Sequence, residues 1–142
     1  MSREAEELNR RLLRARDEMD RAFSDPLDVR TVAAIAHISP AHFSRRFRAV
    51  FGESPHRYLQ RRRVERSMFM LRESESTVTD ICFAVGFSSL GTFSRTFREI
   101  VGQTPTDYRA GHGPIVTPHC VQIAAMRPRT DLERGESEST FR

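Results

Sequence analysis

The sequence predicts an all-α fold of about seven helices, in which two helix-turn-helix units are joined by a central linker helix. Three observations support this prediction. The segment FSRRFRAVFGESPHRY, residues 43–58, recurs as FSRTFREIVGQTPTDY, residues 93–108, with eight identical positions, as expected for a duplicated supersecondary unit. Apolar residues in each copy follow helical spacing. Residues that favour helix N-termini stand before each expected helix.

The 142 residues are expected to fall into four parts. Residues 1–54 hold an opening helix and the first unit, and residues 55–71 form the linker helix. Residues 72–110 hold the second unit, and residues 111–142 form a polar tail that we expect to be partly disordered. The opening helix is indicated by an apolar stripe at helical spacing, which comprises Leu8, Leu12, Ala15, Met19 and Ala22.

In the first unit, Asp28 is expected to cap a short helix that runs through Ala36. After a tight turn, Ser39 caps a second helix with Pro40 in its first position, where proline is favoured. That helix is expected to end at Gly52, because glycine commonly follows the last helical turn.

In the second unit, Thr77 and Asp80 are expected to form a capping box at the start of a short helix. The next helix is capped by Ser88 or Ser89 and ends before Gly102. Both copies then continue with Ser-Pro or Thr-Pro, which starts a further helix.

The linker helix is expected over Pro55–Leu71, which contains no glycine and no internal proline. Its apolar side chains fall on several sides, which indicates contact with both units. Seventeen residues give roughly 25 Å of helix. Such a rod would hold two recognition helices near one DNA turn apart, about 34 Å.

The second helix of each unit is amphipathic. The apolar faces comprise Phe43, Phe47, Val50 and Phe51 in one copy, and Phe93, Phe97, Ile100 and Val101 in the other. The opposite faces comprise Ala41, Ser44, Arg45 and Arg48, and then Gly91, Ser94, Arg95 and Arg98. A small residue followed by hydrogen-bond donors suits entry into a major groove. A merely solvated charged face would explain one such helix, but two matching copies favour DNA binding.

Positive charge is concentrated in the middle of the chain. The net charge is +4, and the densest stretch, Pro40–Arg66, holds eight Arg and two Glu. Residues 28–110 hold 13 Arg against 8 Asp and Glu. This pattern is typical of a protein that binds a polyanion.

Other functional classes find little support. No catalytic constellation appears, and an enzyme fused to the module, such as a DNA-repair methyltransferase, would need a reactive Pro-Cys-His-Arg type motif that is absent. His112, His119 and Cys120 lack a second paired metal-ligand motif, so no metal or cofactor is expected. Cys82 is interpreted as a core thiol. No apolar run is long enough for a membrane span, and a cytoplasmic protein is expected.

The pattern resembles the AraC/XylS family of bacterial transcription regulators over roughly Leu12–Arg109. The strongest motif, Cys82–Arg109 (CFAVGFSSLGTFSRTFREIVGQTPTDYR), fits the family signature I-A-x-x-x-G-F, F-x-R-x-F and G-x-x-P-x-x-Y-R. The resemblance implies an all-helical, homeodomain-like module that sets two recognition helices in successive major grooves of an asymmetric promoter site. Because fewer than 30 residues precede the module, the chain resembles the stand-alone members rather than those with a ligand-sensing domain.

The resemblance also implies the site residues. Base contacts are expected from Ala41, Ser44, Arg45, Arg48, Leu90, Gly91, Ser94, Arg95 and Arg98. Phosphate contacts are expected from Ser39, Arg46, Arg61 and Ser89. The expected partners are double-stranded DNA, bound as a monomer, and RNA polymerase, which the protein recruits or blocks.

Three departures from the family pattern bear on the site. His37 replaces the usual turn glycine, so it is expected to need a left-handed backbone. Cys82 replaces a small alanine. Leu90 and Gly91 are poor hydrogen-bonding residues, so base reading by the second unit is expected to rest mostly on Arg95.

Two alternative functions and one residue stay open at this point. The chain could be controlled by a separate sensor protein, or it could be a protein–protein adaptor that kept the fold and lost DNA binding, against which the intact Arg pairs argue. Phe69 lies on the linker helix where solvent is expected. It is either a packing residue between the units or a contact for a partner.

Overall fold

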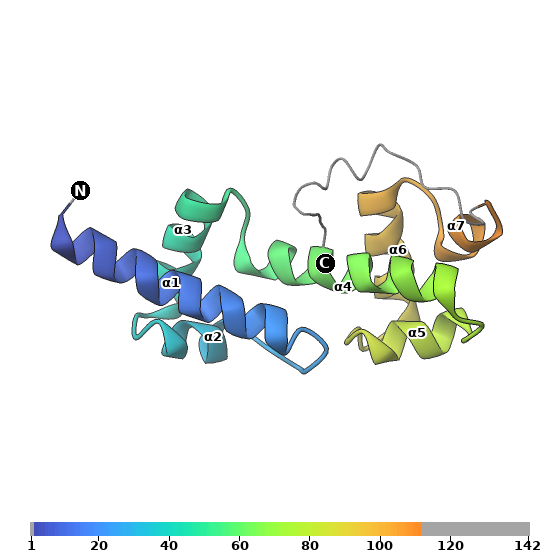
Figure 1. The fold of residues 1–142 in the computed structure, drawn as a ribbon, viewed down its shortest axis with the longest axis horizontal. Helices are drawn as coiled ribbons and strands as arrows, with labels where there is room; N and C mark the ends of the chain where they lie inside the picture. Colours follow the sequence, from blue (N-terminus) through green and yellow to red (C-terminus); the bar gives the residue numbers. More distant parts are fainter. Residues whose placement is uncertain (1, 112–142) are drawn as a thin grey trace.

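A computed structural model describes residues 2–111, which fold into seven helices and contain no strand. The helices are α1 (Arg3–Arg21), α2 (Val29–Ile35), α3 (Pro40–Phe51), α4 (Pro55–Glu73), α5 (Val78–Ala84), α6 (Leu90–Val101) and α7 (Pro105–Gly111). Figure 1 shows α1–α3 at one end of an elongated molecule, α5–α7 at the other, and α4 between them. The all-α prediction with two units and a linker helix is confirmed. The expected tail, with His112, His119 and Cys120, lies outside the described residues.

Side-chain caps begin the helices where the sequence predicts them. Asp28 accepts a hydrogen bond from the backbone N–H of Thr31 at 2.8 Å, and Ser39 caps α3 with Pro40 as its first residue. In the second unit Thr77 caps α5. Of the two candidate serines before α6, Ser89 is the cap, and it accepts from Thr92 N–H at 3.1 Å. Each cap satisfies a backbone donor that the helix itself leaves unpaired.

Left-handed backbone conformations occur at the expected turns. Gly52 and Gly102 end α3 and α6 with φ of 86° and 96°. His37 has φ of 61° and is the single non-glycine residue with positive φ among residues 2–111. The expectation that His37 replaces a turn glycine in a left-handed conformation is confirmed.

The aromatic residues of the repeat form the core of each unit. In the first unit, Phe43 and Phe47 are fully buried, and their ring centroids lie 5.5 Å apart. In the second, Phe93 and Phe97 are fully buried with centroids 5.7 Å apart. Tilted or edge-on rings at this separation combine large burial with favourable quadrupole geometry.

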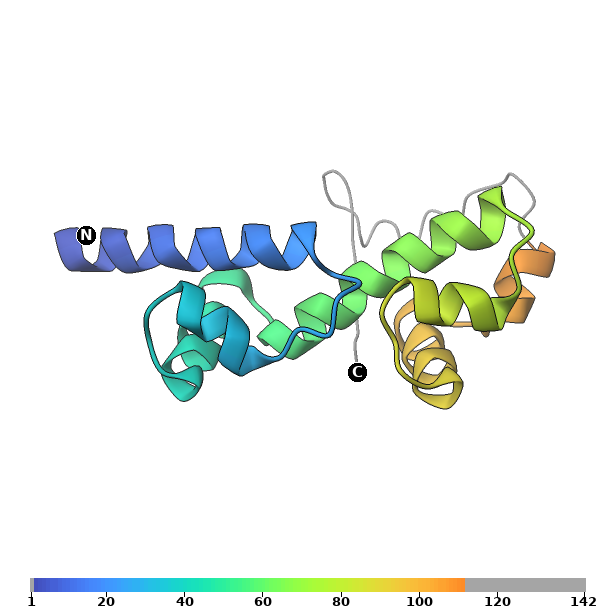
Figure 2. The ribbon, with the colours of Figure 1, turned by 90° about the horizontal axis from the view of Figure 1, so that it is seen from below.

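Helix α4 belongs to both units, as the scatter of its apolar residues predicts. Near its beginning, the ring of Tyr58 packs edge-on against Phe47 of α3 at 5.6 Å. At its end, the carbonyl of Leu71 accepts a hydrogen bond from Arg109 of α7 at 3.1 Å. The helix runs two residues past the stretch expected from the sequence and ends at Glu73. Helix α4 therefore packs against the first unit near its beginning and against the second unit near its end (Figure 2).

Candidate nucleic-acid interface

The second helix of each unit presents one face to the core and the other to solvent. On α3 the buried side chains are Phe43 and Phe47, and on α6 they include Phe93 and Phe97. Because a helix turns about 100° per residue, the residues one and two positions after each first phenylalanine lie away from the core. The tight turn before each helix leaves its beginning uncovered, and Figure 2 shows the two beginnings at the same edge of the molecule.

Every residue expected to contact bases lies on these solvent-facing surfaces. Ala41, Arg45, Arg48, Leu90, Gly91, Arg95 and Arg98 are exposed, and Ser44 and Ser94 are half-buried. We call the two sets the α3 face and the α6 face. Leu90 has 40% of its surface exposed, and an added Cβ at Gly91 would meet no atom within 4 Å. The α6 face therefore begins with an apolar side chain and open space, with its donors further along.

The arginines on the two faces differ from the paired arginines of α4. Within residues 2–111, the guanidinium groups of Arg45, Arg48, Arg95 and Arg98 make no hydrogen bond or ion pair to another residue. By contrast, Arg62 donates to Asp20 at 3.1 Å and to Glu65 at 2.8 Å. Guanidinium groups that are exposed and unpaired keep all five donors for an external ligand.

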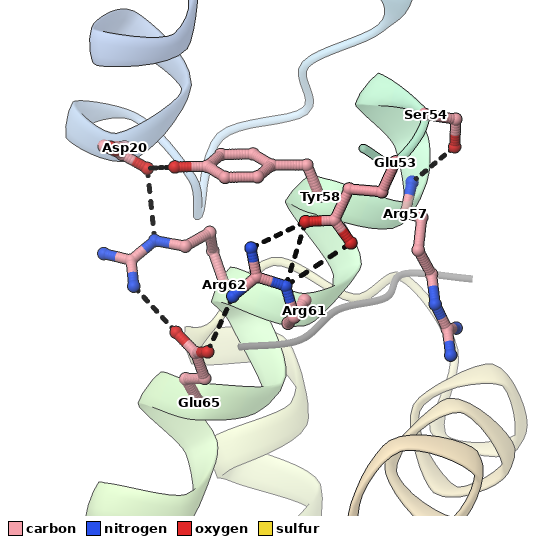
Figure 3. Close-up of polar contacts among 8 residues, drawn as sticks. All are labelled: Asp20, Glu53, Ser54, Arg57, Tyr58, Arg61, Arg62 and Glu65. Carbon is pink, nitrogen blue, oxygen red and sulfur yellow. Dashed lines mark hydrogen bonds and ion pairs between the residues drawn. The ribbon is translucent and has the colours of Figure 1, made fainter. Parts of the chain in front are cut away.

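Arg61, which is expected from the sequence to contact a phosphate, pairs with carboxylates of the protein itself (Figure 3). Its guanidinium pairs with Glu53 at 2.6 Å and with Glu65 at 2.9 Å. It also lies 5.3 Å from the ring centroid of Tyr58. Two carboxylates already neutralise this cation, so the geometry favours a role in holding the start of α4 over a role in binding DNA.

The other expected phosphate-binding residues keep some freedom. Ser39 and Ser89 are exposed, although each hydroxyl already accepts the capping hydrogen bond of its helix. Arg46 is half-buried, and its Nε is buried without a hydrogen-bond partner. A hydroxyl that accepts from the backbone can still donate its proton.

Two further sequence interpretations can be compared with the structure. Cys82 is fully buried, and burial raises the pKa of its thiol to about 11, as expected for an inert core thiol.

Phe69 is 45% exposed, and the guanidinium of Arg66 lies 4.8 Å from its ring centroid. Its exposure does not fit packing between the units, so the partner contact is the interpretation that stays open.

Sequence reasoning assigned no role to Arg63, which joins elements of both units. It is the third of three consecutive arginines. Arg61 and Arg62 share Glu65, whereas Arg63 binds backbone carbonyls of the distant α1–α2 connection. No local signal in the sequence indicates this contact, because only the tertiary fold brings that connection to α4. In the described part of the chain, no helix is long and apolar enough to cross a membrane, and no cluster of metal-binding side chains occurs.

Comparison with known proteins places this geometry in a defined group. A helix-turn-helix domain family matches residues 32–111. An uncharacterized HTH-type transcriptional regulator from Staphylococcus aureus is 33% identical over 101 residues, which cover 71% of this chain and 13% of that protein. The chain therefore spans a small part of the length of this relative.

Solved structures share the fold as well as the sequence pattern. The DNA-binding domain of AdpA, a global transcriptional factor, was determined in complex with a target DNA. It superimposes with a TM-score of 0.68 and 31% identity, covering 70% of this chain and 90% of that domain. A transcriptional regulator from Chromobacterium violaceum, of a class described as AraC-type DNA-binding domain-containing proteins, gives a TM-score of 0.65 and 28% identity. The match covers 72% of this chain and 91% of the other.

Proposed function

Because the chain belongs to the AraC-type helix-turn-helix family of DNA-binding transcription regulators, we propose that it reads an asymmetric promoter site with α3 and α6 in successive major grooves. The observation that carries this proposal is the repeated, solvent-facing set of unpaired arginines on the α3 and α6 faces. A chain with two non-identical reading helices is suited to a site without palindromy.

Arg45 and Arg95 are the proposed principal base-reading residues. Each lies two positions after the buried phenylalanine that anchors its helix, so its backbone is fixed while its guanidinium is free. An arginine fork can bind the O6 and N7 atoms of guanine in a bidentate manner. Ala41, Ser44, Arg48, Gly91, Ser94 and Arg98 lie beside them as proposed secondary contacts, and Leu90 is suited to a thymine methyl group.

The two faces are proposed to read their half-sites differently. Each face offers one serine and two arginines behind a small residue, which is Ala41 on α3 and Gly91 on α6. The α6 face differs in beginning with Leu90, which has no hydrogen-bonding side chain, and base reading by the second unit is proposed to depend mainly on Arg95. Phosphate contacts are proposed for Arg46, Ser39 and Ser89, each close to a recognition helix, where a contact positions the protein without selecting sequence.

One chain carries both reading helices, so we propose that it binds DNA as a monomer. Regulation would then follow from contact with RNA polymerase, for which the exposed Phe69 is a candidate surface residue. No catalytic step is part of this function.

Selection of bound sequences from random duplex DNA, followed by footprinting, tests the proposal. We expect an asymmetric site with two protected segments about one helical turn apart. Inserting about 5 base pairs, half a turn, between the half-sites should abolish protection of one half. Protection of both halves on that DNA would show flexibly tethered units, and a palindromic consensus would show that the chain binds as a dimer.

A further inference from the structure

Arg63 projects from the middle of α4 to the connection between α1 and α2. Its Nε donates a hydrogen bond to the carbonyl of Phe23 at 2.5 Å, and its Nη2 donates to the carbonyl of Asp25 at 2.7 Å. One planar guanidinium therefore holds two backbone carbonyls of a connection that belongs to the first unit. A lysine, with a single ammonium group, could not reproduce this two-point contact.

The same side chain contacts the second unit. Its guanidinium lies 6.0 Å from the ring centroid of Phe87, in the turn between α5 and α6. A Cβ built on Gly86, in that turn, would lie 2.7 Å from Nε of Arg63 and 3.0 Å from the carbonyl oxygen of Phe23. The backbone of the second unit therefore approaches the backbone of the first closely enough to exclude a methyl group. Figures 1 and 2 both show this connection beside the α5–α6 turn.

We propose that Arg63, the carbonyls of Phe23 and Asp25, and Gly86 form a latch that fixes the spacing and rotation of α6 relative to α3, and so selects the spacing of the two half-sites. This inference rests on the proposed function, because it assumes that both helices read one DNA molecule. Arg63 is a positioning residue in this scheme and does not touch DNA.

A contact away from the α4 axis has a specific mechanical effect. Both units pack on α4. If α4 were their one connection, only the side chains around that helix would prevent the units from rotating relative to each other about its axis. The latch adds a second connection between the units at a distance from that axis. An ion pair between Arg57 of α4 and Glu99 of α6, at 3.7 Å, is a further link, but it is exposed and so contributes little.

Arg63 is half-buried and stays charged. Desolvation lowers its pKa to about 10, so the guanidinium keeps its charge at neutral pH. Charge-assisted hydrogen bonds to carbonyls are stronger than neutral ones, and losing the donor would leave two carbonyls without this partner.

Half-site spacing is the property that such a latch controls. Each additional base pair moves one half-site by about 3.4 Å and rotates it by about 35° relative to the other. A protein with fixed units cannot follow this change and loses the binding contribution of one unit. A protein with loosely joined units follows it and keeps most of that contribution.

The test uses two latch variants and a matched control for each. Arg63→Met removes the donors and keeps the stem, and its control is Arg66→Met, because Arg66 is an exposed residue of the same helix that contacts Phe69. Gly86→Ala inserts a methyl group into the latch, and its control is Gly102→Ala. Gly102 has a similar positive φ, but a Cβ there meets no atom within 4 Å, so the control carries the backbone strain without the clash.

Each protein is titrated with the selected duplex, with the same duplex carrying one or two inserted base pairs, and with a duplex in which one half-site is scrambled. For the wild type and both controls, one inserted base pair should weaken binding by about tenfold or more, as expected when one linked unit disengages. For both latch variants the same insertion should cost about threefold or less, while affinity for the scrambled duplex stays within about twofold of wild type. That second readout separates loss of positioning from loss of folding.

The outcomes distinguish the two proposals. If the wild type binds the scrambled duplex as tightly as the intact one, the two-groove function itself is wrong. If the wild type needs both half-sites but tolerates every insertion, the units are flexibly tethered and the latch is wrong. If the wild type is sensitive and both latch variants remain equally sensitive, the function stands and the latch is wrong. If Arg66→Met or Gly102→Ala relaxes the spacing as much as the latch variants do, the effect is general loosening and the latch is again wrong.

Discussion

In the first unit the rings of Phe47 and Tyr58 meet at 5.6 Å with an interplanar angle of 68°. In the second, Phe97 and Tyr108 meet at 5.7 Å and 69°. The two pairs occupy matching positions of the repeat, and their geometry is nearly the same. Each fixes the helix that follows the recognition helix, which is α4 in the first unit and α7 in the second.

The tyrosine hydroxyls, however, have different partners. Tyr58 donates to the carboxylate of Asp20 in α1 at 2.6 Å, whereas Tyr108 accepts from Arg72 at the end of α4 at 2.5 Å. The tyrosine hydroxyl thus bonds to α1 in the first unit and to α4 in the second. The comparison shows that α4 serves twice, as the last helix of one unit and the opening helix of the next. The duplicated aromatic core is kept, and the surrounding polar contacts differ because the neighbouring helices differ.

The largest expected effect comes from deleting the aromatic core of one unit. Phe47→Ala and Phe97→Ala should each lower the free energy of unfolding by about 3–5 kcal/mol, because each removes a fully buried ring. Urea unfolding measures the loss, and hydrogen exchange shows where it falls. We expect Phe97→Ala to expose the amides of α5–α7 before those of α2 and α3. Phe69→Ala, which truncates a 45% exposed ring, is the control and should change stability little. Equal loss of protection in both units would show that they unfold as one body.

Interrupting the shared helix should separate the units. Glu65→Pro removes a backbone donor in the interior of α4 and should cost about 3 kcal/mol or more. Because Glu65 also pairs with Arg61 and Arg62, Glu65→Ala is the control that removes these ion pairs alone. Calorimetry should resolve two transitions for the proline variant and one for the alanine variant. A single sharp transition for both would mean that α4 is not the joint.

Removing one arginine from the α3 face or the α6 face should have an effect of intermediate size on DNA binding. Arg45→Ala and Arg95→Ala should each cost about 1–3 kcal/mol of specific affinity and relax base preference in one half-site. Because Arg45 and Arg95 occupy matching positions with the same neighbouring donors, each variant should flatten mainly its own half-site. Binding to sets of single-base variants of the selected site measures both effects.

Arg21→Ala is the control for this comparison, since it removes an exposed arginine of α1 that pairs with Glu18 away from both faces. It should leave base preference unchanged. If an arginine variant on either face melts early while base preference stays as in the wild type, the assignment of the helix faces is reversed.

Features that depend on a few neighbouring residues could be predicted from the sequence. The caps at Asp28, Ser39 and Thr77 and the left-handed turn at His37 follow from local backbone chemistry. The buried and exposed sides of α3 and α6 follow from helical periodicity, except that Val50, expected on the apolar face of α3, is 40% exposed. The repeat strengthened both predictions, because the two copies had to obey the same pattern.

Features that depend on tertiary partners could not be predicted. Arg61, Arg62 and Arg63 are adjacent in sequence, yet they bind Glu53 and Glu65, Asp20 and Glu65, and two backbone carbonyls, respectively. The phosphate contact of Arg61 stays a prediction, although its guanidinium is already paired with Glu53 and Glu65 in the protein. Glu53 lies eight residues before Arg61 and outside α4, so helical spacing alone does not indicate this pair. The end of α4 was also placed two residues early, as helix ends are set by weak local preferences.

The smallest expected effect is the pH dependence of one core position. Cys82 of the second unit corresponds to Ala33 of the first, and both are buried. Burial raises the pKa of the thiol from 9.0 to about 11, so between these values the unfolded chain releases a proton that the folded protein keeps. The free energy of unfolding should therefore fall as the pH rises from about 9 to about 11.

Cys82→Ala makes the second unit resemble the first at this position and should remove that part of the alkaline loss. At about pH 8 we expect the variant to be less stable by about 1 kcal/mol, because it loses buried volume and the sulfur contact with the carbonyl of Ser89 at 3.5 Å. At about pH 10.5 the difference from wild type should shrink or reverse. Burial also raises the pKa of Tyr58, so some alkaline loss should persist in the variant, and Tyr58→Phe identifies that share. Urea unfolding of the wild type and the two variants at both pH values makes the measurement. A difference between wild type and Cys82→Ala that stays constant with pH would mean that the thiol loses its proton equally easily in the folded and unfolded states.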